Sequence, residues 1–335
     1  MKKMNDSGDF DETFDKYNTE KYPHKIGFIK EIAQKDNNYF NASIHCLTNI
    51  APLSNLILGN EKTNYSYIRL LEKIQEQFNR KKDEIDAFAI NDCLKKLKKY
   101  IFSNQYNKEI NDPKALISFL LKDFQNNNYI TQGDLYDFNI ICKSCFMLNN
   151  KIPIIDDVKI IEFDFPNIIK NNNMIKKNNI TIYDCFNYYF KCSNSLNSFY
   201  CNKCHKTNES GGIVIIPKIL IIFINYGNEL ICYRNSYEFD ETISFKDFDF
   251  INNEDKNRKL FLNSMIACKN LGGYFETYYA FARANEKSKY YLYNGNEVRG
   301  NMKVTNKIKK KEINLKNQKE SWPFILVYID ENKNL

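Results

Sequence analysis

The spacing of apolar residues changes from helical to strand-like near residue 138 of this 335-residue chain. Before that point, apolar residues recur every three or four positions among charged ones, which is typical of amphipathic helices. After it, short runs rich in Ile, Val, Phe and Tyr are separated by polar turns, as in β-strands. Helices first and strands later predict an α+β fold.

The same spacing gives the positions of the expected elements. We expect helices over 40–58, over 66–102 as two or three pieces, and over 113–124, where Pro113 suits a helix start. The strand-like runs are 138–145, 159–165, 211–217, 219–226, 230–239, 278–284, 289–298 and 323–330.

The composition is that of a globular protein. With 43% hydrophobic and 15% aromatic residues, the chain has enough apolar material for one large core or two moderate ones. Residues 1–24 are polar and contain no apolar stretch of signal-peptide length, so we expect a flexible lead-in. The longest apolar run, 211–224, is interrupted by Pro217 and Lys218 and suits buried strands better than a membrane span. We therefore expect no membrane association and an intracellular protein, nuclear or cytoplasmic, that is not secreted.

The net charge of +7 is spread along the whole chain and gives only weak support for nucleic-acid binding. The densest basic run is KIKKKEINLKNQK, residues 307–319. We expect it to be a solvated loop, with contact to an acidic partner as the alternative.

Four of the ten cysteines form two C-x-x-C pairs: Cys142 with Cys145, and Cys201 with Cys204. In an intracellular protein such pairs are more often metal ligands than disulfides. Two pairs supply the four thiolates of a closed structural zinc site, so Zn²⁺ is the expected cofactor. The intervening residues, 146–200, exceed an ordinary zinc ribbon and should carry strands of their own before returning. Four unrelated reduced thiols are the alternative.

A cysteine hydrolase needs a thiolate, an imidazole within hydrogen-bond reach, and a group that orients the imidazole. The three histidines of the chain are His24, His45 and His205. His45 precedes Cys46 within the expected first helix, where adjacent side chains diverge by about 100°. His24 falls in the expected lead-in, and His205 directly follows the second cysteine pair. The sequence therefore offers no obvious catalytic pair.

Residues 35–58 resemble the segment that carries the catalytic cysteine in the ubiquitin-specific proteases. Four further blocks follow in the order of that family: the helix at 111–124, the cysteine pairs with 216–226, the histidine segment at 272–298, and the closing strand at 323–330. The resemblance implies a papain-like fold with a helical thumb, zinc-clamped β fingers and a β-sheet palm. It implies one domain over 25–332, with the thumb at about 25–135, the fingers at about 136–222 and the palm at about 223–332.

The same resemblance implies that the catalytic residues are absent. The nucleophilic cysteine of the family falls on Asn38, and the general-base histidine falls on Thr277. The residue that orients the histidine falls on Asn294, and the oxyanion-hole asparagine falls on Asp36. Loss of one triad member lowers the rate by about 10⁴–10⁶. No residue is therefore expected to be catalytically active.

These observations predict a pseudo-deubiquitinase, a ubiquitin carboxyl-terminal hydrolase-like domain that binds ubiquitin, a ubiquitin-like protein or a larger protein complex. The family includes an inactive member of the spliceosomal tri-snRNP, whose opening block resembles 35–58, so mRNA splicing is one expected setting. Two alternatives stay open. The first is an active cysteine-type deubiquitinase with non-standard residues, such as Cys46 as nucleophile. The second is a zinc-stabilised binder of nucleic acid or ribonucleoprotein.

Overall fold

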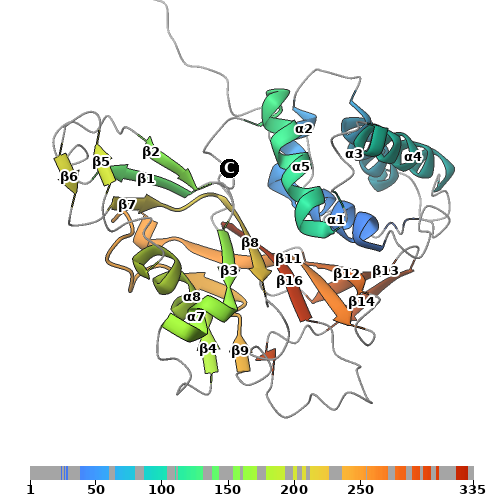
Figure 1. Ribbon diagram of the computed structural model, residues 1–335. Coiled ribbons are helices and arrows are strands. Elements are labelled where there is room, and N and C mark those ends of the chain that lie inside the picture. Colours follow the sequence, from blue (N-terminus) through green and yellow to red (C-terminus); the bar gives the residue numbers. More distant parts are fainter. Residues whose placement is uncertain are drawn as a thin grey trace, which may run out of the picture.

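The computed structural model of the chain combines a group of helices with a large, mostly antiparallel sheet, which confirms the α+β prediction (Figure 1). The structure describes residues 24, 26, 28, 38–59, 65–79, 87–103, 110, 112–130, 138–142, 154–158, 161–171, 179–192, 199–201, 206–208, 212–225, 236–253, 255–270, 276–283, 289–294, 297–302, 307–308 and 322–330.

The helical region, which corresponds to the expected thumb, contains five helices among the described residues. They are α1 (Asn38–Thr48), α2 (Ala51–Leu58), α3 (Ser66–Asn79), α4 (Ala87–Ser103) and α5 (Pro113–Asn126). The single helix expected over 40–58 is therefore wrong, because the chain breaks between α1 and α2. Pro52 has no N–H to donate to the carbonyl of Thr48, which accepts a hydrogen bond from the Ser54 hydroxyl instead (3.2 Å).

The palm sheet has eight strands, in the order β14-β13-β12-β11-β16-β8-β3, with β10 also paired to β11. All neighbours are antiparallel except β3 and β8, which are parallel. The strands are β3 (Ile161–Asp164), β8 (Ile219–Asn225), β10 (Thr242–Ser244), β11 (Lys259–Asn270), β12 (Glu276–Ala282), β13 (Tyr290–Asn294), β14 (Glu297–Met302) and β16 (Trp322–Asp330).

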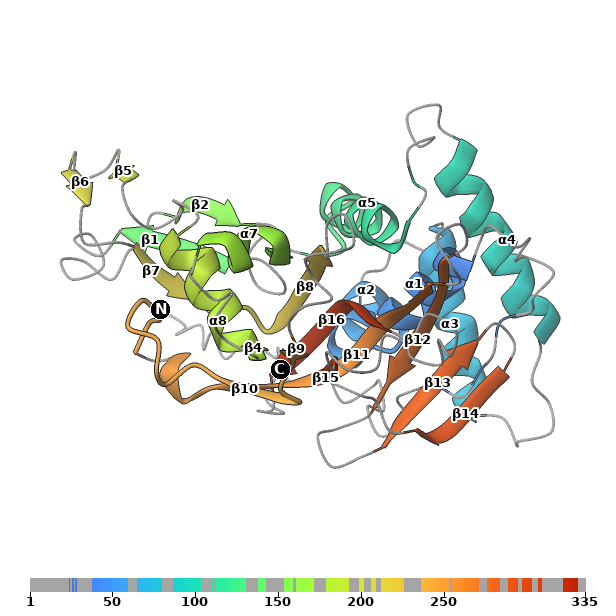
Figure 2. The same cartoon turned by 60° about the horizontal axis from the view of Figure 1, so that its bottom comes forward.

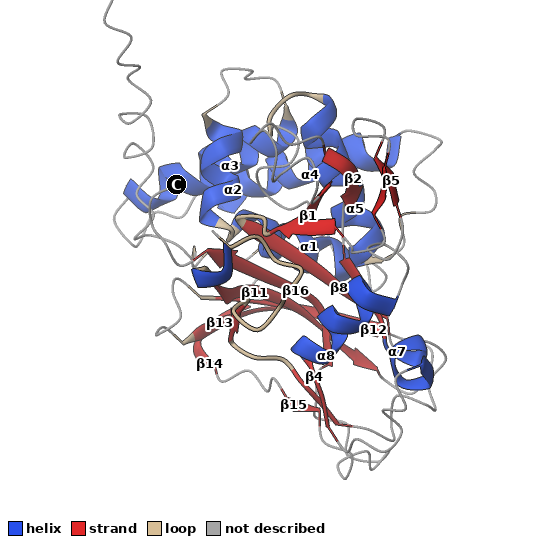
Figure 3. Cartoon of the chain, turned by 90° about the vertical axis from the view of Figure 1, so that its left-hand side faces the viewer, coloured by secondary structure: helices blue, strands red, loops and turns tan. Residues whose placement is uncertain are grey.

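Both faces of this sheet are buried. Along β16, Ile325 and Val327 belong to the core beneath the thumb helices, whereas Leu326 and Tyr328 belong to a second core. Successive side chains of a strand point to opposite faces, so one strand serves both cores. The second core is covered by α7 (Phe165–Asn171), α8 (Ile182–Asn187) and the π-helix Tyr188–Cys192. Figure 3 shows the thumb helices gathered on one side of the sheet and α7 and α8 apart from them.

The region expected to form the fingers contains a small sheet in the order β2-β1-β7. Its strands are β1 (Phe138–Cys142), β2 (Ile154–Val158) and β7 (Gly212–Ile215), and a separate hairpin pairs β5 (Phe199–Cys201) with β6 (Lys206–Asn208). Between the two cysteine pairs the chain forms strands, as expected, but it also forms α7, α8 and the palm strand β3. The expected range of the fingers therefore also supplies parts of the palm.

A third small sheet joins β4 (Asn179–Thr181), β9 (Ser236–Glu238) and β15 (Lys307–Ile308). Lys307 and Ile308 begin the basic run that was expected to be a loop, and the structure places them in a strand paired with β9. The rest of that run, 309–319, lies outside the described residues.

His24, expected in the flexible lead-in, is instead fully buried in the thumb region. Ile26 and Phe28 are buried with it and belong to the first core. Residues 1–23 lie outside the described part of the chain. None of the described helices is long and apolar enough to span a membrane.

Candidate functional site

The candidate site comprises the start of α1 and strand β12 of the palm, the two elements on which the expected catalytic positions fall. Asn38 is the first residue of α1, and α1 packs against α5 and against strands β11, β12 and β13. The helix is fixed at this end by the Tyr39 hydroxyl, which donates to the carbonyl of Ile110 (3.0 Å). The first turn of a helix carries partial positive charge and stabilises an anion there. A thiolate at position 38 would gain that stabilisation, whereas the carboxamide of asparagine has no anionic form near neutral pH. Asp36, the expected oxyanion position, lies outside the described residues.

Strand β12 carries the position expected to hold the general base. Thr277 is the second residue of β12 and pairs with Lys269 of β11. Tyr278, Ala280 and Ala282 belong to the core beneath the thumb, whereas Phe281 belongs to the second core. Alternation along the strand therefore turns Tyr278 toward the thumb and Thr277 toward the opposite face.

Tyr278 is buried, with its ring centroid 5.5 Å from that of Phe324. Asn294, expected to orient a base, ends β13 and pairs with Glu297 of β14. The pairing of β12 with β13 ends at Ala280 opposite Tyr293, and Asn294 is the next residue of β13. A hydroxyl at either position 277 or 278 is a poor proton acceptor near neutral pH. The strand thus brings no imidazole to the place where the family needs one.

Cys46, the alternative nucleophile, is fully buried two turns further along α1. Its Sγ lies 3.5 Å from the Ser264 hydroxyl, and burial raises the pKa of the thiol to about 12. A reactive cysteine needs the opposite shift, toward or below neutral pH. Cys46 therefore behaves as a small core residue that contacts β11.

His24 and His45 lie together in the core, a placement that sequence reasoning missed. The Nε2 of His24 is 2.9 Å from the Thr48 hydroxyl, and its backbone N–H donates to Oδ1 of Asn49 (2.8 Å). Tyr293 of β13 donates its hydroxyl to the carbonyl of His24 (2.6 Å). The His45 ring stacks on Phe28 with centroids 3.7 Å apart.

Burial lowers the pKa of His24 to about 3. A neutral, fully buried imidazole whose Nε2 already contacts a threonine hydroxyl is a packing group. In the sequence His-Lys-Ile-Gly-Phe, residues 24–28, the apolar Ile26 and Phe28 are two positions apart, and this spacing was the available signal for burial here. The third histidine, His205, lies outside the described residues.

The predicted zinc ligands fall at one end of the finger sheet. Cys142 is the last residue of β1 and pairs with Gly212, the first residue of β7. Because β7 continues into the palm strand β8, the end that holds Gly212 and Cys142 is the outer end. Figures 1 and 2 both place the β5–β6 hairpin, which includes Cys201, beside this outer end.

Cys145 and Cys204 lie outside the described residues, and among those that are described no three His, Cys, Asp or Glu side chains form a metal-binding group. Each pair nevertheless begins at a strand end, and two C-x-x-C pairs supply the four thiolates that tetrahedral Zn²⁺ takes. The zinc site stays a prediction.

Comparisons with known proteins identify the fold. The sequence profile described as ubiquitin carboxyl-terminal hydrolase matches residues 30–328. No curated protein sequence matches the chain. Among solved structures, a chain of the SAGA Ubp8/Sgf11/Sus1/Sgf73 DUB module bound to ubiquitin aldehyde superposes with a TM-score of 0.52 and 14% identity. The match covers 91% of this chain and 69% of the other.

A second solved structure, described as an essential yeast splicing factor, superposes with a TM-score of 0.53 and 14% identity over 92% of this chain and 69% of the other. At this identity the two structures bear on the fold alone, and they agree with the papain-like arrangement of thumb, fingers and palm. The family profile spans most of the chain, in keeping with the residue blocks that first suggested the resemblance. This chain belongs to the ubiquitin carboxyl-terminal hydrolase family.

Proposed function

We propose that this domain is a catalytically inactive member of its family that works by binding, with ubiquitin, a ubiquitin-like protein or a larger protein complex as partner. The observation that carries the proposal is Asn38 as the first residue of α1. Thiol chemistry in this fold class depends on sulfur at the positive end of that helix. The nearest cysteine in the helix, Cys46, is eight residues later, about 12 Å along the axis.

The missing imidazole supports the same conclusion independently. Papain-like hydrolysis needs a base that takes the proton of the thiol and later returns it to the leaving amine. Thr277 and Tyr278 carry hydroxyls, and both described histidines lie in the core around Tyr293. The nucleophile and the base of such a site act as a unit. A chain that lacks both is therefore expected to have little catalytic rate enhancement left.

The fold similarities support a binding role. One of the two similar structures is a DUB module bound to ubiquitin aldehyde, and the other is a splicing factor. The same architecture thus occurs in a protein that holds ubiquitin and in one that belongs to the splicing machinery. For this chain we propose protein binding, with assembly into a ribonucleoprotein complex as one setting of that role.

Zinc would be structural in this proposal. The thiolates of Cys142, Cys145, Cys201 and Cys204 would hold the ion, and it would clamp the outer end of β1 to the β5–β6 hairpin. The fit rests on the donor set and on the two strand ends at the same tip.

The test separates binding from hydrolysis. The full chain is incubated with ubiquitin-rhodamine, and its binding to ubiquitin and to a panel of ubiquitin-like proteins is measured by biolayer interferometry. We expect no hydrolysis above the protein-free rate, together with saturable binding of at least one panel member. Two cysteines are the controls: Cys46, and Cys268, a partly exposed residue of β11. Hydrolysis that disappears on Cys46→Ala or Cys268→Ala would overturn the inactive assignment. Failure of every panel member to bind would instead point away from the ubiquitin fold as partner.

A gain-of-function series addresses the cause of inactivity. Asn38→Cys is combined with Thr277→His in one variant and with Tyr278→His in another, because alternation turns residue 278 toward the thumb. We expect Asn38→Cys alone to react with ubiquitin vinyl sulfone slowly and the pair with Tyr278→His to react faster, whereas the pair with Thr277→His should gain less because residue 277 faces the opposite side of the sheet. The matched control is Cys46→Ser in the Asn38→Cys background, which should leave the labelling unchanged.

A further inference from the structure

The outer face of α4 presents one continuous stripe of side chains to solvent. Phe88, Asp92, Lys95 and Lys99 are spaced by four, three and four residues, so they align along one side of the helix. The stripe is about 16 Å long at the rise of an α-helix. The opposite side of α4 is anchored in the core beneath the thumb through buried Ile90, Leu94, Leu97 and Ile101. The stripe is therefore held on a rigid, well-packed support.

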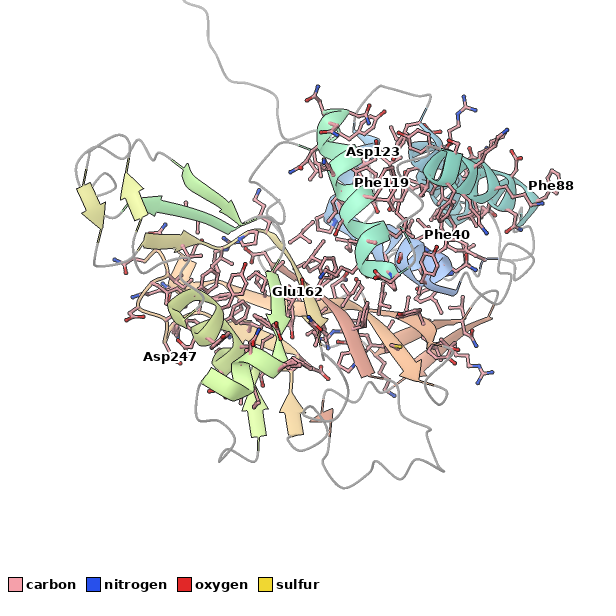
Figure 4. All side chains as sticks on the ribbon, viewed as in Figure 1. Phe40, Phe88, Phe119, Asp123, Glu162 and Asp247 are labelled. Atoms are coloured by element: carbon pink, nitrogen blue, oxygen red, sulfur yellow. The ribbon has the colours of Figure 1, made fainter. Side chains whose placement is uncertain are left out.

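Phe88 at the end of this stripe is 84% exposed and is, among the described residues, the one large apolar side chain that is exposed. Figure 4 shows it at the free end of α4, pointing away from the body of the molecule. A single exposed apolar residue is common on protein surfaces and means little by itself. An aromatic ring at the end of a charged stripe, however, has the composition of an interface anchor.

The charges of the stripe are unbalanced. Asp92 forms an ion pair with Lys96 (2.7 Å) on the neighbouring turn. Within the described part of the chain no ion pair joins Lys95 or Lys99 to a carboxylate. Lys95 and Lys99 are one helical turn apart and both exposed, so they present two positive charges about 6 Å apart. The stripe therefore suits a partner that carries negative charge.

A groove of about 460 Å³ runs between α3 and α4 beside the stripe. The groove is lined by residues of both charges: the cations are Arg69, Lys73 and Lys96, and the carboxylates are Glu72 and Asp92. Its lining also includes the small residues Ala89 and Cys93. The carboxylates would repel the continuous negative backbone of a nucleic acid, whereas a protein segment can place individual side chains between them. The mixed groove thus favours a protein partner.

We propose that the outer face of α4 docks an acidic protein segment that packs an apolar side chain on Phe88 and places carboxylates on Lys95 and Lys99. The distance from Phe88 to Lys95 along the axis is about 10 Å, which a partner spans with seven helical residues or three extended ones. This surface lies on α4, apart from the start of α1 and from strand β12. The inference therefore stands or falls separately from the proposed function, which was argued from the start of α1 and from β12.

The test selects peptides without assuming a sequence. A phage-displayed library of random peptides of about 16 residues, longer than the stripe even when helical, is selected against the full chain. We expect the enriched peptides to carry net negative charge and at least one large apolar residue. Their Kd, measured by fluorescence anisotropy, should rise at least about tenfold in Phe88→Ala and in Lys95→Glu/Lys99→Glu.

The matched control is Lys218→Glu/Lys259→Glu, which makes the same change of charge at two exposed lysines of the palm region. Binding is measured at several salt concentrations between about 0.05 and 0.5 M, so that the general effect of the lower net charge on the Kd can be subtracted. After this correction we expect the Kd of the control to stay within about twofold of wild type. Alanine at position 88 suits an exposed helical site, so the variant should fold normally.

Three outcomes would overturn the proposal. The first is a library that yields no enriched peptide, or enriched peptides that are neutral or basic. The second is acidic peptides that bind the α4 variants as tightly as wild type. The third is a uridine oligonucleotide of about 15 nucleotides that binds through Lys95 and Lys99 more tightly than the selected peptides, which would assign the stripe to single-stranded nucleic acid.

Discussion

Arg283 is the largest fully buried side chain of the described structure, and its guanidinium joins three parts of the palm. Its Nε donates to the carbonyl of Leu262 (2.7 Å), and its two terminal nitrogens donate to the side chain and backbone carbonyl of Glu241 (2.7 and 3.1 Å). The guanidinium also lies over the ring of Tyr290, 4.8 Å from its centroid. A buried cation is tolerated only when its donors are used in this way.

Replacing Arg283 should therefore destabilise the palm strongly. We expect Arg283→Ala to lower the free energy of unfolding by about 3 kcal/mol, because it leaves a cavity and unsatisfied carbonyls. Arg283→Lys keeps the charge but not the planar set of donors, so its free energy of unfolding should lie between those of wild type and Arg283→Ala. Urea denaturation followed by circular dichroism measures both changes. Lys259→Ala, at an exposed position of β11, is the control and should change stability by less than about 0.5 kcal/mol.

His24 makes the stability of the fold depend on pH in a definite direction. Its pKa is lowered to about 3 in the folded chain by burial, against 6.5 for an exposed histidine. Between these two values the unfolded chain binds a proton that the folded chain does not, so stability falls as pH falls. The contribution is complete above pH 6.5 and is lost progressively toward pH 3. The slope is about 1.4 kcal/mol per pH unit within that window.

Substitution of this histidine should flatten the pH dependence. His24→Gln removes the titrating group and keeps a side chain able to hydrogen-bond to Thr48. We expect the free energy of unfolding to decrease less steeply in the variant than in wild type between pH 6.5 and about 4. The carboxylates titrate in both proteins, so the difference between the two curves isolates the histidine. If the stability curves of wild type and His24→Gln are parallel between pH 6.5 and about 4, the histidine has the same pKa in the folded and the unfolded chain, and the prediction is wrong.

At the scale of elements, the helices with strong apolar spacing were predictable and their interruptions were not. α3, α4 and α5 lie where the sequence placed them, because their buried faces repeat at helical spacing over several turns. The break after α1 depends on one proline, and α7 and α8 are too short to show a clear period. A local signal for α8 did exist: Thr181 and Asp184 form a capping box, with each side chain bonded to the backbone N–H of the other.

The start of α5 is stabilised by a cap whose loss can be measured. Asp112 accepts a hydrogen bond from the backbone N–H of Ala115 (2.8 Å). Asp112→Ala should lower the free energy of unfolding by about 1 kcal/mol, whereas Asp112→Asn keeps an acceptor and should lose much less. The measurement is chemical denaturation at neutral pH. Lys114 in the first turn of α5 forms an ion pair with Glu162 of β3, so this helix start also contacts the edge of the palm. Glu162 is labelled in Figure 4.

At the scale of the whole molecule, the sheet is shared between two cores, and this explains why the site was only partly predictable. The order of the sequence blocks placed Asn38 at a helix start, and the structure places it there. The orientation of Thr277 depends on which face of β12 the thumb covers, which no local pattern specifies. The burial of His24 depends on contacts with Tyr293, 269 residues away along the chain. Such long-range contacts follow from the assembled fold and not from nearby residues.

The fingers consist of a three-stranded sheet and a separate two-stranded hairpin, and we expect their stability to depend on metal more than that of the rest of the molecule. Small sheets often need a metal or other cross-link for stability. We therefore expect one zinc ion per chain by mass spectrometry of the native protein, and loss of that ion in Cys145→Ser or Cys204→Ser.

Removal of zinc should then unfold part of the chain only. In hydrogen-exchange mass spectrometry after treatment with a strong chelator, the peptides of β1, β5 and β6 should lose protection, whereas α1, β11 and β16 should keep it, because their side chains fill the two cores. Cys93→Ser, which changes a thiol on the thumb helix α4, is the control and should retain zinc. Zinc that survives in both ligand variants would assign the four cysteines to separate reduced thiols. Loss of protection across the whole palm would show instead that fingers and palm unfold as one unit.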